Sequence, residues 1–520
     1  MIMSKNIFNS VKMFKPKRNH FDLSHDVKMS LNFGKLYPTL AMEVVPGDSV
    51  SIGCESLIRM APLVAPVMHR MNCFMHYFFV PNRIVWEGWE DWITNADSVR
   101  VHPYINLTNT NSQIKSLNDY LGLPSYGSSV GHKVSAIPHA AYQMIYNEYY
   151  RDQNLIPEVS FKLVDGDNGS NGELQVLRNR AWQHDYFTSA LPFAQKGNAV
   201  DIPLGDVSLK NEGIPGDRNP RFVGSNTGND HVGDLSQDNV LGYPQILLDP
   251  GSPDPKQPVV YDPAGTLEVE PTTITDLRRA FKLQEWLEKN ARAGTRYVES
   301  ILSHFGVRSP DARLQRPEYI TGVKAPISIS EVLNTTGEEA GLPQGNMAGH
   351  GVAIANGKYG KYYAQEHGYI IGIMSILPLT AYQNGIPRHF LKTDDQFKHY
   401  WPSFAHIGEQ EVEKKEVYVS SSPTYNATPF GYVPRYAEYK FMQSRVAGDF
   451  KASLAYWHLG RTWEGISPGE EPELNQNFIE CKPRQDIFAV TDPDADKFYA
   501  HIYHSIHAKR PMAKFGNPQF

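Results

Sequence analysis

The stretch VMHRMNCFMHYFFVPNRIV, residues 67–85, decides the fold class. Apolar and aromatic residues fill nearly every position of its middle part, which predicts a strand that is buried on both faces. Pro81 and Asn82 end the run, because these residues favour a turn over a continuing strand. A second stretch of the same kind, GYIIGIMSILPLTAY, covers residues 368–382. Strands buried on both faces indicate a layered β protein with a sizeable core.

Outward from this stretch, further strands and turns are predicted on both sides. Residues 21–61 contain an alternating segment and then two apolar runs around a turn at residues 46–48. More strands are expected at 319–330 and at 497–509, whereas the glycine-rich residues 337–360 predict a loop. The predicted fold class is mainly β, an antiparallel sandwich or barrel with long loop and helix insertions.

Three helical segments are predicted between the strands. Trp86, Trp89 and Trp92 recur at three-residue spacing, which is typical of a helical stripe that packs in a core. Residues 137–154 show an apolar face with helical period, and a long helix is predicted over residues 275–305.

The segment from 196 to 270 differs in kind from the rest. Its 75 residues include 10 Gly and 9 Pro and few neighbouring apolar residues. Such a segment cannot build much core of its own, and a loop of this length in a compact fold is usually functional. It is therefore interpreted as an inserted surface lobe.

Both ends of the chain are basic, although the net charge of the whole chain is −6. The first 21 residues hold five cations and no acid, and the last 24 hold four cations and no acid. The 475 residues between them therefore carry a net charge of −15. Basic ends on an acidic body favour a polyanion held by terminal arms, although solvated termini are often basic without any ligand.

The closing stretch HIYHSIHAKRPMAKFGNPQF, residues 501–520, leaves two alternatives open. As a strand it places His501 and His507 on one face, roughly 20 Å apart, and His504 on the other. That distance is too long for one metal ion, so interface or core histidines are expected and no metal site. The tail beyond the strand could contact phosphates and stack on bases, or could lie under a neighbouring subunit with Phe520 as an apolar plug.

Several classes of protein find no support in the sequence. Cys54, Cys73 and Cys481 are odd in number and lack CxxC spacing, so neither a disulfide framework nor a zinc site is expected. No signal peptide and no run of about 18 apolar residues is visible, which predicts a soluble protein without a membrane span, made in a reducing cytoplasm. The segment GHGVAI at 349–354 departs from GxGxxG, and no P-loop, HExxH or GxSxG occurs. No enzyme activity, no catalytic residue and no cofactor are predicted.

Six long phrases, in one order along the chain, are more specific than any short motif. They are FDLSHDVKMSLNFGKLYPTLAMEVVPGDSV (21–50), YFFVPNRIVWEGWEDWIT (77–94), IPHAAYQMIYNEYYRDQN (137–154), RAWQHDYFTSALPFAQKG (180–197), LRRAFKLQEWLEKNARAGTRYVESILSHFGVRSPDARLQRPEYI (277–320) and HAKRPMAKFGNP (507–518). Together they resemble the major capsid proteins of the Microviridae, the small single-stranded-DNA phages, most closely the gokushovirus branch. The resemblance covers most of the chain but not residues 196–270.

The resemblance implies an eight-stranded antiparallel viral jelly roll with large inserted loops. It also implies a virion protein, assembled in the cytoplasm of the bacterial host, of which 60 copies form a T=1 icosahedral shell around circular single-stranded DNA. The insertion is expected to gather in threes into a protrusion at the threefold axes and to meet a host surface receptor. Implied partners are other copies of the chain, the single-stranded DNA genome, and minor spike, pilot or scaffolding proteins.

This interpretation divides the chain into five parts. They are a basic N-terminal arm (1–20), jelly-roll strands with helical insertions (21–195), a variable surface insertion (196–270), the remainder of the jelly roll with the long helix (271–507) and a basic C-terminal arm (508–520). Charge alone, without a family match, selects the candidate DNA-binding residues Lys5, Lys12, Lys15, Lys17, Arg18, Lys509, Arg510, Lys514 and, as a stacking group, Phe515.

The alternative is a secreted β-sandwich protein that binds or degrades glycans, whose exposed Trp and Tyr would stack on sugars. A signal peptide and a close pair of carboxylates would support this alternative, and neither is visible in the sequence.

Overall fold

A computed structural model provides the fold of the chain. It describes residues 17–125, 127, 131–198, 200–201, 273–294, 296–335, 347–357, 359–467 and 469–515, and the backbone of short strands between 207 and 269. The chain divides into two compact units, one formed by Met1–Ala194 with Asn290–Phe520 and the other by Gln195–Lys289.

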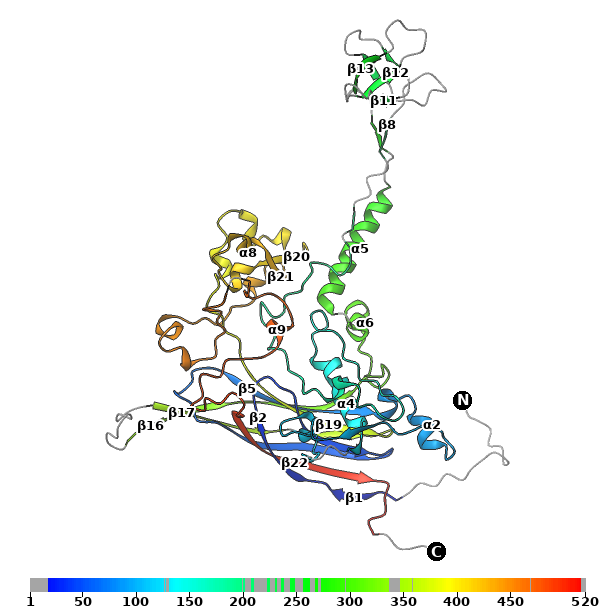
Figure 1. Cartoon of the computed structure of the whole chain (residues 1–520), viewed down its shortest axis with the longest axis vertical. Helices are drawn as coiled ribbons and strands as arrows, with labels where there is room; N and C mark the ends of the chain where they lie inside the picture. Colours follow the sequence, from blue (N-terminus) through cyan, green and yellow to red (C-terminus); the bar gives the residue numbers. More distant parts are fainter. Residues whose placement is uncertain are drawn as a thin grey trace. The chain divides into compact units, whose positions relative to one another are not determined.

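The first unit is built on two antiparallel sheets (Figure 1). The larger sheet has the order β1-β22-β4-β17-β16, with β2 paired to β22 and β18 paired to β4. Its strands are β1 (Asn19–Asp22), β2 (His25–Leu31), β4 (Ser49–Met60), β16 (Ser328–Leu333), β17 (Met347–Asn356), β18 (Gly360–Tyr363) and β22 (Phe498–Arg510). The first and last strands of the chain are therefore neighbours in one sheet.

The smaller sheet has the order β15-β5-β19-β3. Its strands are β3 (Tyr37–Val44), β5 (Met71–Pro81), β15 (Glu318–Pro326) and β19 (Gly368–Pro378). The two stretches that were predicted to be buried on both faces are its central strands, β5 and β19, and in β19 every residue except Tyr369 is buried. This prediction is confirmed for β19 and for Tyr77–Pro81 of β5, whereas Asn72, Phe74 and His76 of β5 are only partly buried.

The two sheets face each other across the main core. Met75 and Phe79 of β5 pack there with Ile502 of β22. Phe78 and Val80, which flank Phe79, belong to a second core on the opposite face of the smaller sheet. This change of core with a period of two residues explains why β5 carries buried apolar residues on both faces. The predicted mainly β, antiparallel architecture is confirmed and is consistent with a jelly roll. The two sheets hold seven and four strands in the described residues, so the predicted number of eight strands is not confirmed.

Short helices cover the second core. They are α1 (Asn82–Val85), α2 (Trp89–Thr94), α4 (Ile137–Ile145) and the π-helix η1 (Tyr146–Tyr150). The predicted single tryptophan stripe is wrong, because Trp86 lies between α1 and α2 rather than within one helix. The helical conformation is interrupted before α2, and Gly88 lies in this interruption, where a Cβ atom would lie only 2.7 Å from the Trp86 ring. Trp86 and Trp89 are nevertheless buried, as expected of core residues, whereas Trp92 is exposed to 36%.

The remaining described elements of this unit are short. They are β6 (Tyr104–Leu107), α3 (Leu117–Tyr120), β7 (His132–Ser135), η2 (Gly172–Gln175), α6 (Tyr297–Phe305), η3 (Arg388–Phe390), η4 (Gln396–Lys398), η5 (Pro402–Phe404), β20 (Glu409–Glu413), α7 (Lys414–Val417), α8 (Pro423–Ala427), β21 (Pro429–Pro434), η6 (Ala437–Tyr439), η7 (Gly448–Lys451), η8 (Ala455–Trp457) and α9 (Gln476–Ile479). Around β20 and β21 a third core of Phe187, Val412, Phe430 and Phe478 forms a lobe of loops and short helices.

The second unit contains short strands and most of one helix. The strands are β8 (Val207–Leu209), β9 (Phe222–Gly224), β10 (Asp230–His231), β11 (Leu235–Gln237), β12 (Pro244–Leu247), β13 (Lys256–Tyr261) and β14 (Leu267–Val269). The helix is α5 (Ile274–Ala293), and Thr273 caps it by exchanging hydrogen bonds with Asp276. The predicted continuous helix over 275–305 is wrong, because Gly294 adopts a φ of 103° and separates α5 from α6.

The predicted loop over residues 337–360 is also wrong in part. Residues 336–346 lie outside the described residues, but Met347–Asn356 form β17, which pairs with both β4 and β16. A Cβ atom at Gly351 would lie 2.2 Å from the Met60 sulfur, and one at Gly349 would lie 2.6 Å from the carbonyl oxygen of Ala65. The glycines therefore permit close packing of a strand rather than marking a loop.

Candidate nucleic-acid interface

The basic ends of the chain meet at one end of the larger sheet. β1 pairs with the last residues of β22 so that Asn19 lies opposite Arg510 and His20 lies opposite Lys509. The Asn19 side chain also donates a hydrogen bond to the carbonyl oxygen of Met512, at 2.6 Å. The predicted arms at 1–20 and 508–520 are thus ordered where they enter the sheet. Cations about 490 positions apart in sequence are brought together by strand pairing.

The N-terminal candidates divide into two groups. Lys5, Lys12 and Lys15 lie outside the described residues. Lys17 and Arg18 are exposed, and the Arg18 guanidinium donates a hydrogen bond of 3.1 Å to the Tyr363 hydroxyl. Its central carbon lies 5.3 Å from the centre of the Tyr363 ring, so the cation also contacts the aromatic face.

The C-terminal candidates differ in their surroundings. Lys509, Lys514 and Phe515 are exposed, and 78% of the Phe515 surface is open to solvent. The structure therefore places them on the surface, where a phosphate or a base could reach them.

Arg510 is partly buried and forms an ion pair with Asp48. Its Nε lies 3.2 Å from Oδ2 of the fully buried Asp48, and its Nη2 donates to the carbonyl oxygen of Glu43 at 2.9 Å. Burial raises the pKa of Asp48, and the Val45 amide and the Arg510 charge partly offset this effect. Arg510 thus stabilises the turn between β3 and β4, and less of its charge is available to a ligand.

The same face carries residues that sequence reasoning did not select. Lys509 lies opposite His20 on one side and Ser49 on the other, and Ser49 lies opposite Tyr363 of β18. Residues directly opposite in a sheet point to the same face. A row formed by His20, Lys509, Ser49 and Tyr363 therefore crosses four strands, and Arg18 contacts its Tyr363 end. A cation beside aromatic side chains is a combination used by proteins that bind single-stranded nucleic acid. The alternation in β22 could have indicated its outward side chains, but Tyr363 follows the predicted loop and gave no such signal.

The three histidines of β22 alternate as predicted. His501 is exposed, with Nε2 3.1 Å from Asp26. His504 is fully buried, with its ring nitrogens 2.9 Å from the Tyr77 hydroxyl and 3.0 Å from the Thr39 carbonyl oxygen. Burial lowers the pKa of His504 to about 4, so this histidine is a neutral core residue at neutral pH.

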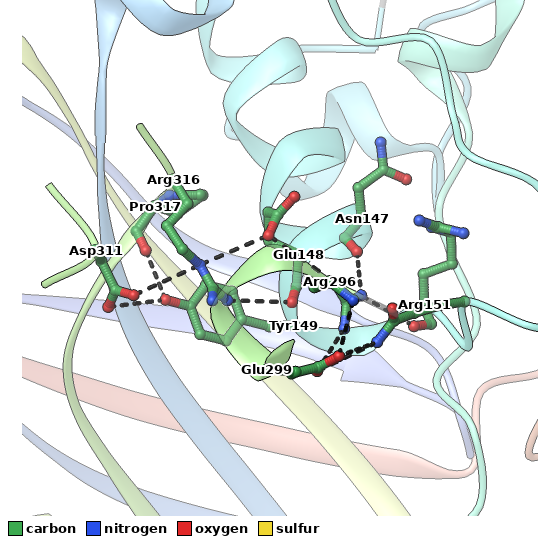
Figure 2. Close-up of polar contacts among 10 residues, drawn as sticks. Asn147, Glu148, Tyr149, Arg151, Arg296, Glu299, Asp311, Arg316 and Pro317 are labelled. Atoms are coloured by element: carbon green, nitrogen blue, oxygen red, sulfur yellow. Dashed lines mark hydrogen bonds and ion pairs between the residues drawn. The ribbon is translucent and has the colours of Figure 1, made fainter. Parts of the chain in front are cut away.

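A second polar cluster joins the π-helix η1 to residues 296–317 (Figure 2). Glu148 lies between two arginines, 3.9 Å from Arg296 and 3.6 Å from Arg316. Arg316 also lies 3.5 Å from Asp311 and 4.6 Å from the centre of the Tyr149 ring. Each carboxylate is paired with a guanidinium, which suits a structural clamp better than acid–base chemistry.

Other chemistry is not organised in the described residues. In the part of the chain that the structure describes, no group of three His, Cys, Asp or Glu side chains is placed to hold a metal ion. All three cysteines are free thiols in buried positions, and burial raises the pKa of Cys73 and Cys481, which disfavours a reactive thiolate. None of the described helices is long and apolar enough to cross a membrane.

Comparison with known proteins gives a consistent result over almost the whole chain. Residues 9–520 match a family described as "Capsid protein (F protein)". The chain is 34% identical to "Capsid protein VP1" of Bdellovibrio phage phiMH2K, over 96% of this chain and 95% of that protein. It is 32% identical to "Capsid protein VP1" of Chlamydia phage 1, over 99% and 97%, and 30% identical to that of Spiroplasma virus 4, over 96% and 95%. All three relatives are structural proteins rather than enzymes, which argues against the glycan-degrading alternative.

Proposed function

This chain belongs to the capsid protein (F protein) family of the Microviridae, and on that premise we propose that 60 copies of it form a T=1 icosahedral shell around circular single-stranded DNA. It is a virion protein with a structural role. Closed symmetry supports a stable shell, because each copy repeats the same contacts with its neighbours and many weak contacts then act together.

The DNA-binding part of the proposal rests on one observation, the meeting of both basic ends at β1 and β22. Lys17, Arg18, Lys509 and Lys514 can neutralise phosphates, and Phe515 can stack on an unpaired base. Lys5, Lys12 and Lys15 extend the same basic segment in sequence. None of these contacts requires a particular base sequence, as a protein that encloses a whole genome needs.

The second compact unit, Gln195–Lys289, contains the segment 196–270 that we propose as the variable surface insertion. Its proposed role is host attachment, through a protrusion that three copies share at a threefold axis. Minor spike, pilot or scaffolding proteins are proposed partners of the shell. The length of the segment and its many glycines and prolines support a function away from the core.

Substitution of Lys5, Lys12, Lys15, Lys17 and Arg18 by Gln tests the DNA-binding role. The proposal predicts less packaged DNA per particle or a lower particle yield, because five phosphate-neutralising charges are lost. A control for the loss of surface charge removes two exposed cations elsewhere, Lys162 and Lys282. Wild-type yield and genome content in the variant with all five substitutions would rule out this arm as a DNA contact.

A further inference from the structure

The larger sheet ends at β16, and this edge differs from the two edges of the smaller sheet, β15 and β3. β16 pairs with β17 in the described residues, and its register runs without a shift from Ser328 opposite Val352 to Leu333 opposite Met347. The paired strands β16 and β17 lie at the left of Figure 1. The outer side of β16 therefore presents backbone N–H and C=O groups that could pair with another strand.

Other edges carry features that block such pairing. β15 contains Pro326 and Lys324, and its register with β5 shifts between Tyr319 and Thr321. At the opposite edge, β3 contains Pro38, and its register with β19 also shifts. Prolines, charges and bulges of this kind protect an edge from pairing with another chain.

β16 shows none of these protective features except one charge. Its sequence, SISEVL, has no proline and a single charged residue, Glu331. Val332 and Leu333 are about half exposed, at 52% and 48%. A regular edge with exposed apolar side chains and a single charge is an aggregation hazard in a free protein, and it becomes useful when a fixed partner covers it.

We propose that β16 pairs antiparallel with β16 of a second copy across a twofold axis of the shell, which joins the larger sheets of two copies. This inference rests on the proposed assembly and names one of its contacts. A second copy fits because a strand that pairs with its own copy forms an isologous contact, and an icosahedral shell supplies the twofold axes.

The sequence of β16 favours one register of this pairing. A twofold axis perpendicular to the sheet keeps every side chain on its own face, and residues directly opposite each other also share a face. The axis must therefore pass through a residue, which then lies opposite its own copy, and cannot pass between two residues. If the axis passed Glu331, two like charges would lie directly opposite, which is destabilising. An axis at Ser330 avoids this contact and places Ile329 opposite Glu331 of the second copy. It also pairs five residues of β16, 328–332, whereas an axis at Ile329 or Val332 would avoid the same contact but pair only three. The proposed register therefore centres on Ser330.

Cysteine substitution tests this register directly. In particles of the Ser330→Cys variant the two new cysteines lie opposite each other, with Cα atoms about 5 Å apart, which suits a disulfide. Ser328→Cys is the matched control, because its two copies are offset by four residues, about 13 Å. We expect covalent dimers after mild oxidation of Ser330→Cys particles and none from Ser328→Cys particles. The native cysteines are buried and do not compete.

Hydrogen exchange of wild-type particles provides a measurement without any substitution. The β16 amides should exchange at least about tenfold more slowly in particles than in the unassembled chain, because pairing protects them. Intact particles with unprotected β16 amides, or with equal cross-linking of both variants, would overturn the pairing while leaving the assembly in place. Protection without a Ser330 cross-link would overturn the proposed pairing centred on Ser330. A wild-type chain that never assembles would instead refute the proposed function.

Discussion

At the scale of single residues, the clearest lesson concerns Arg510. Charge alone selects it as a DNA contact, but Asp48, which is distant in sequence, holds it in an ion pair. Asp48 was part of a predicted turn, and nothing in the local sequence showed which cation would approach it. Residue types are thus sufficient to choose candidates, whereas long-range pairing decides which of them remain available.

The Asp48–Arg510 pair leads to a stability prediction. Arg510→Gln should lower the free energy of unfolding by about 2 kcal/mol or more, because it leaves a buried carboxylate without its cation. The neighbouring Lys509→Gln should change it by less than about 0.5 kcal/mol, because that side chain is exposed. Urea unfolding of the unassembled chains measures both values. Equal effects of the two substitutions would contradict the structural role of Arg510.

His504 leads to a prediction of pH dependence. The unfolded imidazole takes up a proton near its ordinary pKa of 6.5, whereas the buried imidazole does so only near pH 4. Between these values the unfolded chain binds more protons, so stability falls as the pH is lowered from 6.5 to 4. The loss should be on the order of 3 kcal/mol for this group. Unfolding of the His504→Gln chain should depend less on pH than that of His501→Gln, and identical pH profiles would count against the assignment.

At the scale of elements, strands were easier to predict than breaks between elements. β5 and β19 could be recognised from their dense apolar sequence, because each borders two cores. β17 was missed because its glycines, which read as a loop, serve close packing against β4. The separation of α5 from α6 depends on the backbone conformation of one residue, Gly294. Apolar residues at helical spacing do not indicate this break.

The polar cluster around Glu148 should stabilise the attachment of α6 to η1. Glu148→Ala should lower the free energy of unfolding by about 1–3 kcal/mol, because Arg296 and Arg316 lose their shared acceptor. Glu87→Ala is the control, since Glu87 is 85% exposed in its pair with Lys162 and should contribute less than about 0.5 kcal/mol. Thermal or urea unfolding of both variants checks the difference. A control as costly as Glu148→Ala would show that the cluster has no special role.

At the scale of the whole molecule, the family could be identified from long phrases of sequence, whereas the site could not. The phrases extend from β1 to β22 and fix the order of the elements. Strand register decides which side chains share a face of the sheet. The six sequence phrases do not indicate this register. The row formed by His20, Lys509 and Tyr363 became visible only when four strands were aligned.

The insertion can be tested separately from the body. Replacement of residues 196–270 by a short Gly-Ser linker should leave the first unit folded, because the hydrophobic cores described for it use residues outside this segment. Host attachment should be lost, as measured by adsorption of particles to host cells. A shortened chain that cannot fold would show that the segment is part of the core rather than an insertion. Unchanged adsorption would contradict its proposed role in host attachment.

The most direct test of the central claim is a reconstruction of purified particles with their genome. It should show a closed T=1 shell of 60 copies, in which β1 and the end of β22 face inward and lie against density for DNA. A chain that remains a single molecule under conditions that favour assembly, or a shell with these ends on its outer surface, would contradict the account.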